Sequence, residues 1–445
     1  MRTLSRVLGC SSALAAVAVL SAAPAAAAPG QLDPSFGSGG TAITQFPSSY
    51  SGARAVAVQA DGRIVAAGFA HTDNSILSDF AVVRYDSSGA LDPTFGGAGL
   101  VRTDFAGRYD EALAVAVQPD GRIVVAGSSS DASGRDMAVA RYNPDGTPDA
   151  SFDGDGLALV DLGGESTAEA VAVQPDGRVV LAGWATRPVG PGCCTSDFAL
   201  VRLTVGGLPD GTFGAGGAVY TDFLPGADNG YDAAHAVLLL ADGRIVAAGG
   251  GVATATSVDF AVARYLADGS PDPAFGAGGL VTTEFVGYYD EIRSLAAATG
   301  GQLVAGGESC EFPGSSDEVC DFGLARYGSD GTLDRHFGRR GTVRTDLGRD
   351  VGEGVRGVVV QADGRIVAAG DTAGAGGPDL GLARYRADGR LDRTFGTGGL
   401  VRVPVSAGTD EVGGLAIQAD GRLVATGTAA VTQSFGFFVS RLLAV

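Results

Sequence analysis

The chain contains no lysine, so all 31 of its basic side chains are arginine, against 50 acidic residues and a net charge of −19. Such a charge repels phosphate backbones, and we expect no nucleic-acid partner. Aromatic residues make up only 7% of the 445 residues, whereas there are 72 glycines. A small-residue composition of this kind favours many thin, closely packed sheets over one bulky core.

Long apolar runs are also missing beyond the N-terminus. The segment from Met1 to about Ala28 has Arg2 and Arg6 ahead of an apolar run at 13–20 and ends in small residues, which is typical of a secretory signal peptide. The run is short for a membrane span, and Cys10 precedes it, which disfavours both an uncleaved anchor and a lipoprotein. We therefore expect export without a membrane span, and a net charge of −21 after cleavage.

Four of the five cysteines remain after cleavage, and an exported protein can pair them. Cys310 and Cys320 flank one loop, and a disulfide between them would stabilise the fold by roughly 2.5 to 3 kcal/mol in the chain-entropy model. Cys193 and Cys194 are adjacent, so they either form a strained vicinal disulfide or stay free.

The stretch 113–127, LAVAVQPDGRIVVAG, reads as a buried β-hairpin whose Asp120-Gly121 turn supplies the positive φ angles that a tight hairpin needs. Copies of it recur to the C-terminus. The turns of the seven copies are Asp61-Gly62, Asp120-Gly121, Asp176-Gly177, Asp242-Gly243, Gly300-Gly301, Asp363-Gly364 and Asp420-Gly421. The fifth copy lacks the usual Asp and Arg at 299–302, which predicts a different turn there.

Each hairpin is followed by a variable loop, a third strand such as Asp79 to Tyr85, a linker with a fixed Phe, and a short fourth strand such as Leu100 to Phe105. The linker Phe recurs every 57 to 62 residues. The strand runs do not alternate apolar with polar residues, which indicates burial on both faces. We therefore predict an all-β fold over 29–445: a seven-bladed β-propeller with four antiparallel strands per blade.

The order of the copies predicts how the ring closes. The mature chain starts with a linker and a fourth strand at Gly40 to Phe46, whereas the last copy ends after its third strand at Phe435 to Leu442. Pairing these two segments would complete the seventh blade and cover edges that would otherwise stay open.

The repeated motifs DGRIVAAG, DFAVARY and DGxLDPxFGxGG resemble the delta-60 repeat family of bacterial secreted β-propellers. The resemblance spans the chain from Gln31 to Val445. It implies the propeller fold and export, and it implies no established activity.

One arginine occupies the same position in all seven third strands, as at Arg84 and Arg141. Seven equivalent positions argue against catalysis. A half-buried guanidinium needs a partner, so we expect each Arg to pair with a repeated Asp such as Asp92 or Asp104.

An acidic position lies eight residues before the end of most first strands. Its residues are Asp110, Asp232, Asp290, Glu353 and Asp410. In a propeller this segment leads into the innermost strand, so these carboxylates would gather at one mouth of the central channel, where they could bind Ca²⁺. The alternative is that each one caps a local turn through the backbone.

The loops between second and third strands, at 70–78, 184–196 and 308–320, vary most and should carry a ligand surface. Trp184 and His71 lie in them, and His235 near Asp232 is the one plausible acid/base pair. Trp184 could equally anchor its loop, and His235 could be structural.

We expect a monomeric, exported module that binds an extracellular protein or glycan. The alternatives are a metal-dependent hydrolase or lyase at an acidic channel mouth and a purely structural surface protein. Catalytic motifs are absent from the sequence, and Ca²⁺ is the one cofactor it suggests.

Overall fold

The computed structural model describes residues 28–47, 50–71, 77–105, 107–132, 134–190, 193–225, 230–254, 257–285, 289–311, 319–348, 352–374, 376–432 and 434–444. They form 28 β-strands and one short 3-10 helix, η1 (Thr299–Gly301). Within these ranges no helix has the length and apolar character needed to cross a bilayer. Residues 1–27 of the expected signal peptide lie outside the described residues.

Four kinds of strand alternate along the chain. The innermost strands are β2 (Ser51–Val58), β6 (Tyr109–Val117), β10 (Ser166–Val173), β14 (Ala233–Leu239), β18 (Tyr289–Ala297), β22 (Gly354–Val360) and β26 (Asp410–Ile417). The second strands are β3 (Ile64–His71), β7 (Ile123–Asp131), β11 (Val179–Gly190), β15 (Ile245–Thr254), β19 (Leu303–Glu311), β23 (Ile366–Ala373) and β27 (Leu423–Val431). The third strands are β4 (Ser78–Tyr85), β8 (Gly134–Tyr142), β12 (Cys193–Leu203), β16 (Ser257–Tyr265), β20 (Val319–Tyr327), β24 (Pro378–Tyr385) and β28 (Ser434–Leu442). The outer strands are β5 (Leu100–Thr103), β9 (Leu157–Val160), β13 (Ala218–Thr221), β17 (Leu280–Thr283), β21 (Thr342–Thr345), β25 (Leu400–Val403) and β1 (Thr41–Thr44).

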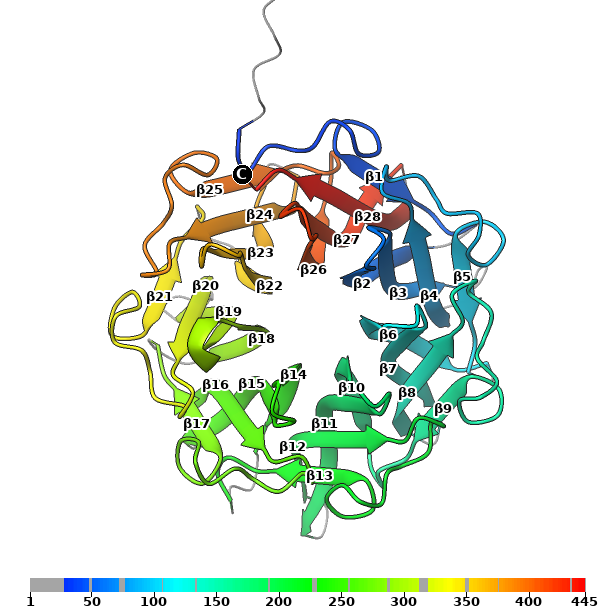
Figure 1. Ribbon diagram of the computed structural model, residues 1–445, viewed down its shortest axis with the longest axis vertical. Coiled ribbons are helices and arrows are strands. Elements are labelled where there is room, and N and C mark those ends of the chain that lie inside the picture. The colour runs from blue at the N-terminus through cyan, green and yellow to red at the C-terminus, as the bar shows by residue number, and fades with distance from the viewer. Residues whose placement is uncertain are drawn as a thin grey trace, which may run out of the picture.

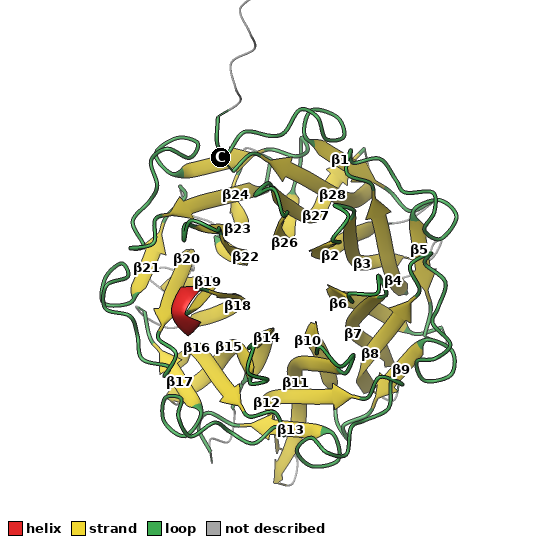
Figure 2. Ribbon diagram, in the orientation of Figure 1, coloured by secondary structure: helices red, strands yellow, loops and turns green. Residues whose placement is uncertain are grey.

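Hydrogen bonding joins the strands into five sheets of four strands and one of eight. The larger sheet consists of β14–β17 and β18–β21, linked by a parallel pair between Val258 and Tyr289. Figures 1 and 2 show the sheets around a common centre, with the innermost strands turned toward it and the outer strands at the rim. The prediction of an all-β, propeller-like fold built from four-stranded antiparallel units is confirmed.

The N-terminal strand belongs to the same sheet as the C-terminal one. Strand β1 pairs antiparallel with β28, with Thr41 opposite Ser440. The backbone N–H of Asp33 donates to the carbonyl of Arg441 at 2.8 Å, and its carboxylate lies 2.9 Å from the Arg441 Nε. The predicted pairing of the two chain ends is therefore present, and β1 covers the edge that β28 would otherwise expose.

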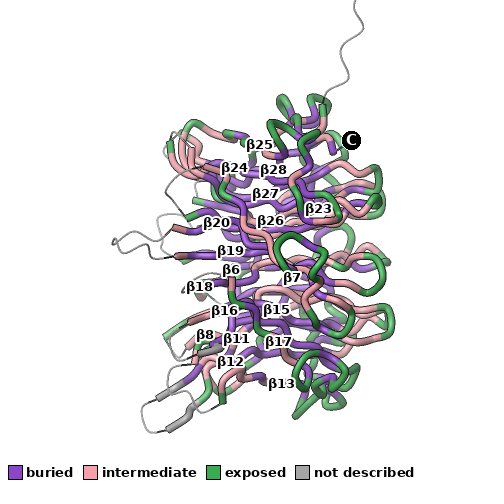
Figure 3. Tube along the Cα trace, turned by 90° about the vertical axis from the view of Figure 1, so that its left-hand side faces the viewer, coloured by how far each residue is buried: buried purple, intermediate pink, exposed green. Residues whose placement is uncertain are grey.

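Apolar side chains fill the spaces between neighbouring four-strand units. Among the described residues they form seven clusters, each shared by two successive units. The cluster that joins the two ends packs Val424 and Phe437 of the last sheet against Ile64 and Ala66 of the first. The strands are accordingly buried along most of their length (Figure 3). Burial on both faces explains the uninterrupted Val and Ala runs of the sequence.

The repeated arginine of the third strands ties each unit to the next. The Arg84 Nε lies 2.8 Å from Asp92, its Nη1 donates to the Pro144 carbonyl of the next sheet, and the guanidinium lies 4.6 Å from the ring centre of Phe95. The other arginines with these three contacts are Arg141, Arg202, Arg264, Arg326, Arg384 and Arg441. The predicted structural role is confirmed, and Asp92 rather than Asp104 represents the partner.

The prediction of a loop at 184–196 is wrong for most of that range. Strand β11 continues to Gly190 and β12 begins at Cys193, with Trp184 paired to Thr167 on one side and Phe198 on the other. A continued ladder satisfies backbone N–H and C=O groups that a loop would leave to water. The side chains of Cys193 and Cys194 lie outside the described part of the structure.

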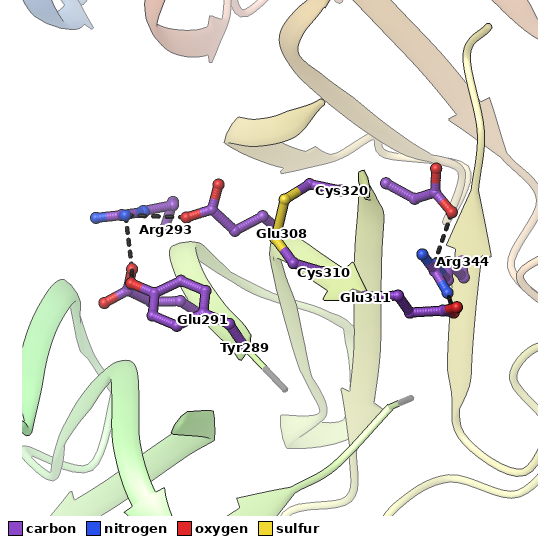
Figure 4. Close-up of a disulfide and its surroundings, with 9 residues drawn as sticks. Tyr289, Glu291, Arg293, Glu308, Cys310, Glu311, Cys320 and Arg344 are labelled. Atoms are coloured by element: carbon purple, nitrogen blue, oxygen red, sulfur yellow. Dashed lines mark hydrogen bonds and ion pairs between the residues drawn. A yellow bond between two sulfur atoms is a disulfide. The ribbon is translucent and has the colours of Figure 1, made fainter. Parts of the chain in front are cut away.

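Two local predictions in the fifth copy agree with the structure. The helix η1 replaces the Asp-Gly hairpin turn at Thr299–Gly301. Cys310 and Cys320 face each other across β19 and β20 and form a disulfide (Figure 4).

Candidate functional site

Every innermost strand carries a β-bulge at the same place. In β2 the pairing with β3 shifts between Ala53 and Ala55, which leaves Arg54 as the extra residue. A bulge redirects the side chain of its extra residue away from the regular pleat. The extra residues of the seven strands are Arg54, Leu113, Glu169, His235, Arg293, Arg356 and Gly413.

All seven bulge residues line one pocket of about 460 Å³, which we call the axial pocket. Because they come from the seven innermost strands, the pocket lies where these strands converge (Figure 1). Its wall also includes Asp371, Pro378, Glu411 and Val412. Its volume falls in the range of roughly 300 to 1,000 Å³ that is common for small-molecule sites.

A buried carboxylate, Glu291, pairs with two residues of the pocket wall, His235 and Arg293; Figure 4 shows Glu291 beside Arg293. Its Oε1 lies 2.6 Å from the His235 Nε2, and its Oε2 lies 2.6 Å from the Arg293 Nη2. The Tyr289 hydroxyl donates to the same Oε2 at 2.5 Å. Arg293 also contacts Glu308 at 3.0 Å. This network connects three neighbouring strands, β14, β18 and β19.

These contacts fix the charges of the network. Burial lowers the pKa of His235, but the Glu291 carboxylate and hydrogen bonds with Glu169 and Glu291 outweigh it and raise the pKa to about 9. Burial raises the pKa of Glu291, but the charge of His235 outweighs it and lowers the pKa to about 2. His235 is therefore a cation at neutral pH, and it cannot serve there as a general base.

On the other side, two arginines flank Gly413. The Arg54 Nε lies 2.8 Å from Glu111, and its Nη1 lies 3.3 Å from Glu411. These two contacts connect β2 with both neighbouring innermost strands. The Arg356 Nε lies 3.1 Å from Asp371, and Asp371 in turn accepts the backbone N–H of Val412 at 2.7 Å.

Four tyrosines lie four residues before bulge residues of the axial pocket, at or just before the start of their innermost strands. This tyrosine collar consists of Tyr50, Tyr109, Tyr231 and Tyr289. Tyr50, Tyr109 and Tyr231 are 40%, 37% and 41% exposed. The ring of Tyr50 lies 4.6 Å from that of Phe435 and 5.2 Å from that of His71, so the predicted ligand residue His71 packs beside the collar.

Of the other two predicted ligand residues, His235 lines the axial pocket, and Trp184 contacts the pocket residue Glu169. His235 is paired with Glu291 rather than with the predicted partner Asp232. Burial raises the pKa of Glu169, but hydrogen bonds with His235 and Trp184 contribute to lowering it below its ordinary value. Trp184 therefore supports a residue of the pocket wall from β11.

The five carboxylates predicted to bind metal are buried, and each accepts at least one backbone N–H of the preceding loop. Asp232 accepts from Phe223 of that loop at 2.8 Å, and also from Val252 of the neighbouring strand β15 at 2.7 Å. The other pairs are Asp110 with Phe105, Asp290 with Phe285, Glu353 with Leu347, and Asp410 with Val405 and Ser406. These bonds correspond to the turn-capping alternative. Burial raises the pKa of Asp232 and Asp290 to about 6.

Two of these carboxylates also belong to clusters whose ligand atoms lie within 4.8 Å of one another. The clusters are Asp79, Asp104 and Asp110, and Asp321, Asp346 and Glu353. Arg102 lies 2.8 Å from Asp79, and Arg344 lies 2.6 Å from Asp321, so each cluster already has a cation beside it. Ca²⁺ binding by the five predicted carboxylates stays a prediction, and two of them, Asp110 and Glu353, have further carboxylates close by.

Sequence reasoning missed most of the residues that line the axial pocket. The sequence did contain one signal, which is variation between the copies. The position three residues after the acidic one holds Arg, Leu, Glu, His, Arg, Arg and Gly in the seven copies. The residue directly after it is always Ala, Ser or Gly. A position that varies within repeated surroundings indicates a binding surface on a repeated scaffold.

Four-stranded antiparallel units around an axial pocket define a protein of the β-propeller class. Five stretches of the chain match the model of a family described as a domain of unknown function (DUF5122) beta-propeller, at 59–95, 118–152, 174–213, 240–275 and 361–395. Each match runs from the end of an innermost strand to the linker Phe. The matches support a β-propeller repeat family of unknown function.

Several solved structures are similar to the chain at low identity. A virginiamycin B lyase from Staphylococcus aureus is 11% identical over 90% of this chain and 98% of its own, with a TM-score of 0.45. The polysaccharide lyase Uly1 is 12% identical over 88% and 90%, with a TM-score of 0.48. An alpha-L-arabinanase from Penicillium chrysogenum is 13% identical over 74% and 92%, with a TM-score of 0.46. No curated protein matches. Likeness at this level carries no argument about activity.

Proposed function

We propose that the protein is a binding module that holds an oligosaccharide in the axial pocket. The observation that supports this best is the gathering of all seven bulge residues, from seven different strands, in one pocket. The scaffold around them repeats, whereas these residues differ from copy to copy. Such a ring can match a ligand that has no symmetry of its own.

The chemistry of the pocket suits a sugar. Sugar hydroxyls both donate and accept hydrogen bonds, and the planar Arg, Asp and Glu groups of the wall donate and accept in pairs. The C–H faces of a sugar ring pack against aromatic rings, and the tyrosine collar offers such faces together with polar hydroxyls. An extended protein surface, the other expected partner, would not need a pocket of about 460 Å³.

Substitution of the collar tests the proposal. Calorimetric titration with a panel of oligosaccharides is expected to find a ligand whose affinity falls at least tenfold in Tyr109→Ala and in Tyr231→Ala, because each loses a stacking surface. Leu208→Ala, which removes an exposed apolar side chain outside the pocket, is the matched control and should bind normally. A panel without any ligand, or equal affinities in all variants, would contradict the proposal.

We also propose that β14–β17 and β18–β21 act as separate blades, which gives seven blades with β1 completing the last. The cluster that packs Val246 and Ala248 against Leu303 and Ala305 lies between these two units and supports separate blades. A density map with another number of blades would contradict this.

Export and a monomeric state belong to the same proposal. The N-terminal sequence of the secreted protein should begin near residue 29, and light scattering should give the mass of one chain. An N-terminus that retains Arg2, or a dimer mass, would contradict these expectations.

Metal dependence and catalysis stay predictions. Adding Ca²⁺ to chelator-treated protein should raise its melting temperature if either carboxylate cluster binds the ion. If the protein is instead a hydrolase or lyase, the bound oligosaccharide should be shortened on prolonged incubation, and Asp232→Asn and Asp290→Asn should abolish that turnover. A pure binder should return the oligosaccharide intact.

A further inference from the structure

The charges of the axial pocket are already matched within the protein. Arg54 has Glu111 and Glu411 as partners, and Arg356 has Asp371. In the second group the cations are Arg293 and His235, and the carboxylates are Glu169, Glu291 and Glu308. Each basic group at the pocket therefore has at least one carboxylate within 4 Å, and the carboxylates outnumber the cations.

This matching makes an anionic ligand unfavourable. A ligand carboxylate would have to displace a protein carboxylate that is already in place, and the displaced group would stay close to the incoming charge. The net charge of −19 adds a long-range repulsion. Among the residues that the structure describes, a free carboxylate therefore finds no uncompensated cation in the pocket.

Hydrogen-bonding capacity nevertheless remains. Among the described contacts Arg356 is bound to Asp371 through Nε, and its side chain is 34% exposed where it lines the pocket. Arg54 is likewise 34% exposed, and Glu411 is 49% exposed. Their remaining N–H groups and carboxylate lone pairs can bond to neutral hydroxyls without any change in the ion pairs.

We propose that the axial pocket selects neutral, polyhydroxylated saccharides over acidic ones, and that Glu411 is a residue that determines this selection. The inference rests on the proposed function and deepens it by naming the ligand class. Glu411 is the most exposed of the pocket carboxylates, and it belongs to β26, whereas its partner Arg54 belongs to β2. Its charge is therefore the one that an incoming acidic group meets first.

Gly413 keeps the two strands in this relation. A side chain at Gly413 would come within 2.5 Å of the Ala53 carbonyl and 2.8 Å of the Arg54 Cα. The missing Cβ lets β26 approach β2 closely, which brings Glu411 within reach of Arg54.

The test compares neutral and uronic-acid oligosaccharides of equal length by calorimetric titration of the full-length mature protein. The wild type is expected to bind the neutral series at least tenfold more tightly, and this affinity should change less than twofold between 50 mM and 500 mM salt. In Glu411→Gln the preference should shrink at least fivefold, because Arg54 loses one of its two carboxylate partners. The control Glu165→Gln removes an exposed carboxylate just before the innermost strand β10, for which no Arg partner is present among the described residues, and it should leave the preference unchanged.

The outcomes separate the two proposals. Binding of neither series overturns the proposed function and this inference with it. Tighter binding of the acidic series by the wild type, or an unchanged preference in a Glu411→Gln variant that melts as the wild type does, overturns the selection and leaves oligosaccharide binding intact. If Glu411→Gln melts early, the salt dependence of the wild type decides: a strong loss of affinity with salt would overturn the selection.

Discussion

Glu291 links neighbouring innermost strands through its side-chain contacts. Its carboxylate is completely buried and meets three donors, from His235, Arg293 and Tyr289. A buried carboxylate is tolerated only when its oxygens are paired in this way, and the loss of one partner leaves an expensive unpaired charge. The His235 proton is therefore part of the fold as well as of the pocket.

This proton predicts a loss of stability at alkaline pH. The pKa of His235 rises from 6.5 in the unfolded chain to about 9 in the folded protein, so its contribution is complete below pH 6.5 and disappears as the pH rises through 9. The effect on the free energy of unfolding is at most about 3 kcal/mol. Urea unfolding at pH 7, 8, 9 and 10 measures it.

The control for this prediction is His235→Gln, which keeps a hydrogen-bond donor for Glu291 and cannot titrate. Between pH 7 and 10 its stability should decline less than that of the wild type. Parallel declines of the two proteins would show that other groups cause the effect.

Among the strands, β19 and β20 are tied by the disulfide between Cys310 and Cys320. Cys310 and Cys320 are 1% and 7% exposed and pair directly across the two strands. On either side, Glu308 contacts Arg293 at the pocket and Glu311 contacts Arg344 toward the outer strand (Figure 4). The disulfide therefore fixes the strand that carries both ion pairs.

Replacing both cysteines by serine should lower the free energy of unfolding by roughly 2.5 to 3 kcal/mol, since the loop is then unconstrained in the unfolded chain. Thermal melting measures the loss. Wild-type protein that is unfolded and refolded in a reducing agent should show the same loss of stability. The double variant treated in the same way should show no further loss. An unchanged melting temperature would contradict a structural role of the bond.

The strands themselves were predictable, whereas the bulges were not. Hairpins such as 113–127 are recognisable from Asp-Gly turns, which six of the seven copies have, and from the apolar runs on either side. A bulge adds a single residue within a strand that is apolar on both faces, so no break in periodicity marks Arg54 or Arg293. At β11 the residues Pro188 and Gly190 favoured a loop, but the pairing with β12 outweighed their local preference.

In the whole molecule, the two chain ends meet in one sheet, and the last unit packs against the first. Residues 28–46 supply β1, the buried rings of Phe36 and Phe46, and Asp33, which contacts both Arg441 and Arg422. At this junction, therefore, the last unit depends on residues from the opposite end of the chain.

Deleting residues 28–46 should lower the free energy of unfolding by about 5 kcal/mol or more, because two buried Phe side chains and the partner of a buried Arg are lost together. Thermal melting and hydrogen exchange of β28 measure the effect. The control Asp149→Asn breaks the equivalent Arg–Asp pair at Arg141 inside the ring and should cost less. Equal melting temperatures for the truncated and intact proteins would contradict closure at this junction.

The bulges have a practical consequence. Each one presents its residue to the axis, while the neighbouring Ala and Val residues pack the sheets. Three of the seven positions are nevertheless constrained: His235 and Arg293 pair with the buried Glu291, and Gly413 is held by the close approach of the Ala53 carbonyl. A library randomised at the other four codons, those of Arg54, Leu113, Glu169 and Arg356, would sample new specificities while these three contacts stay in place.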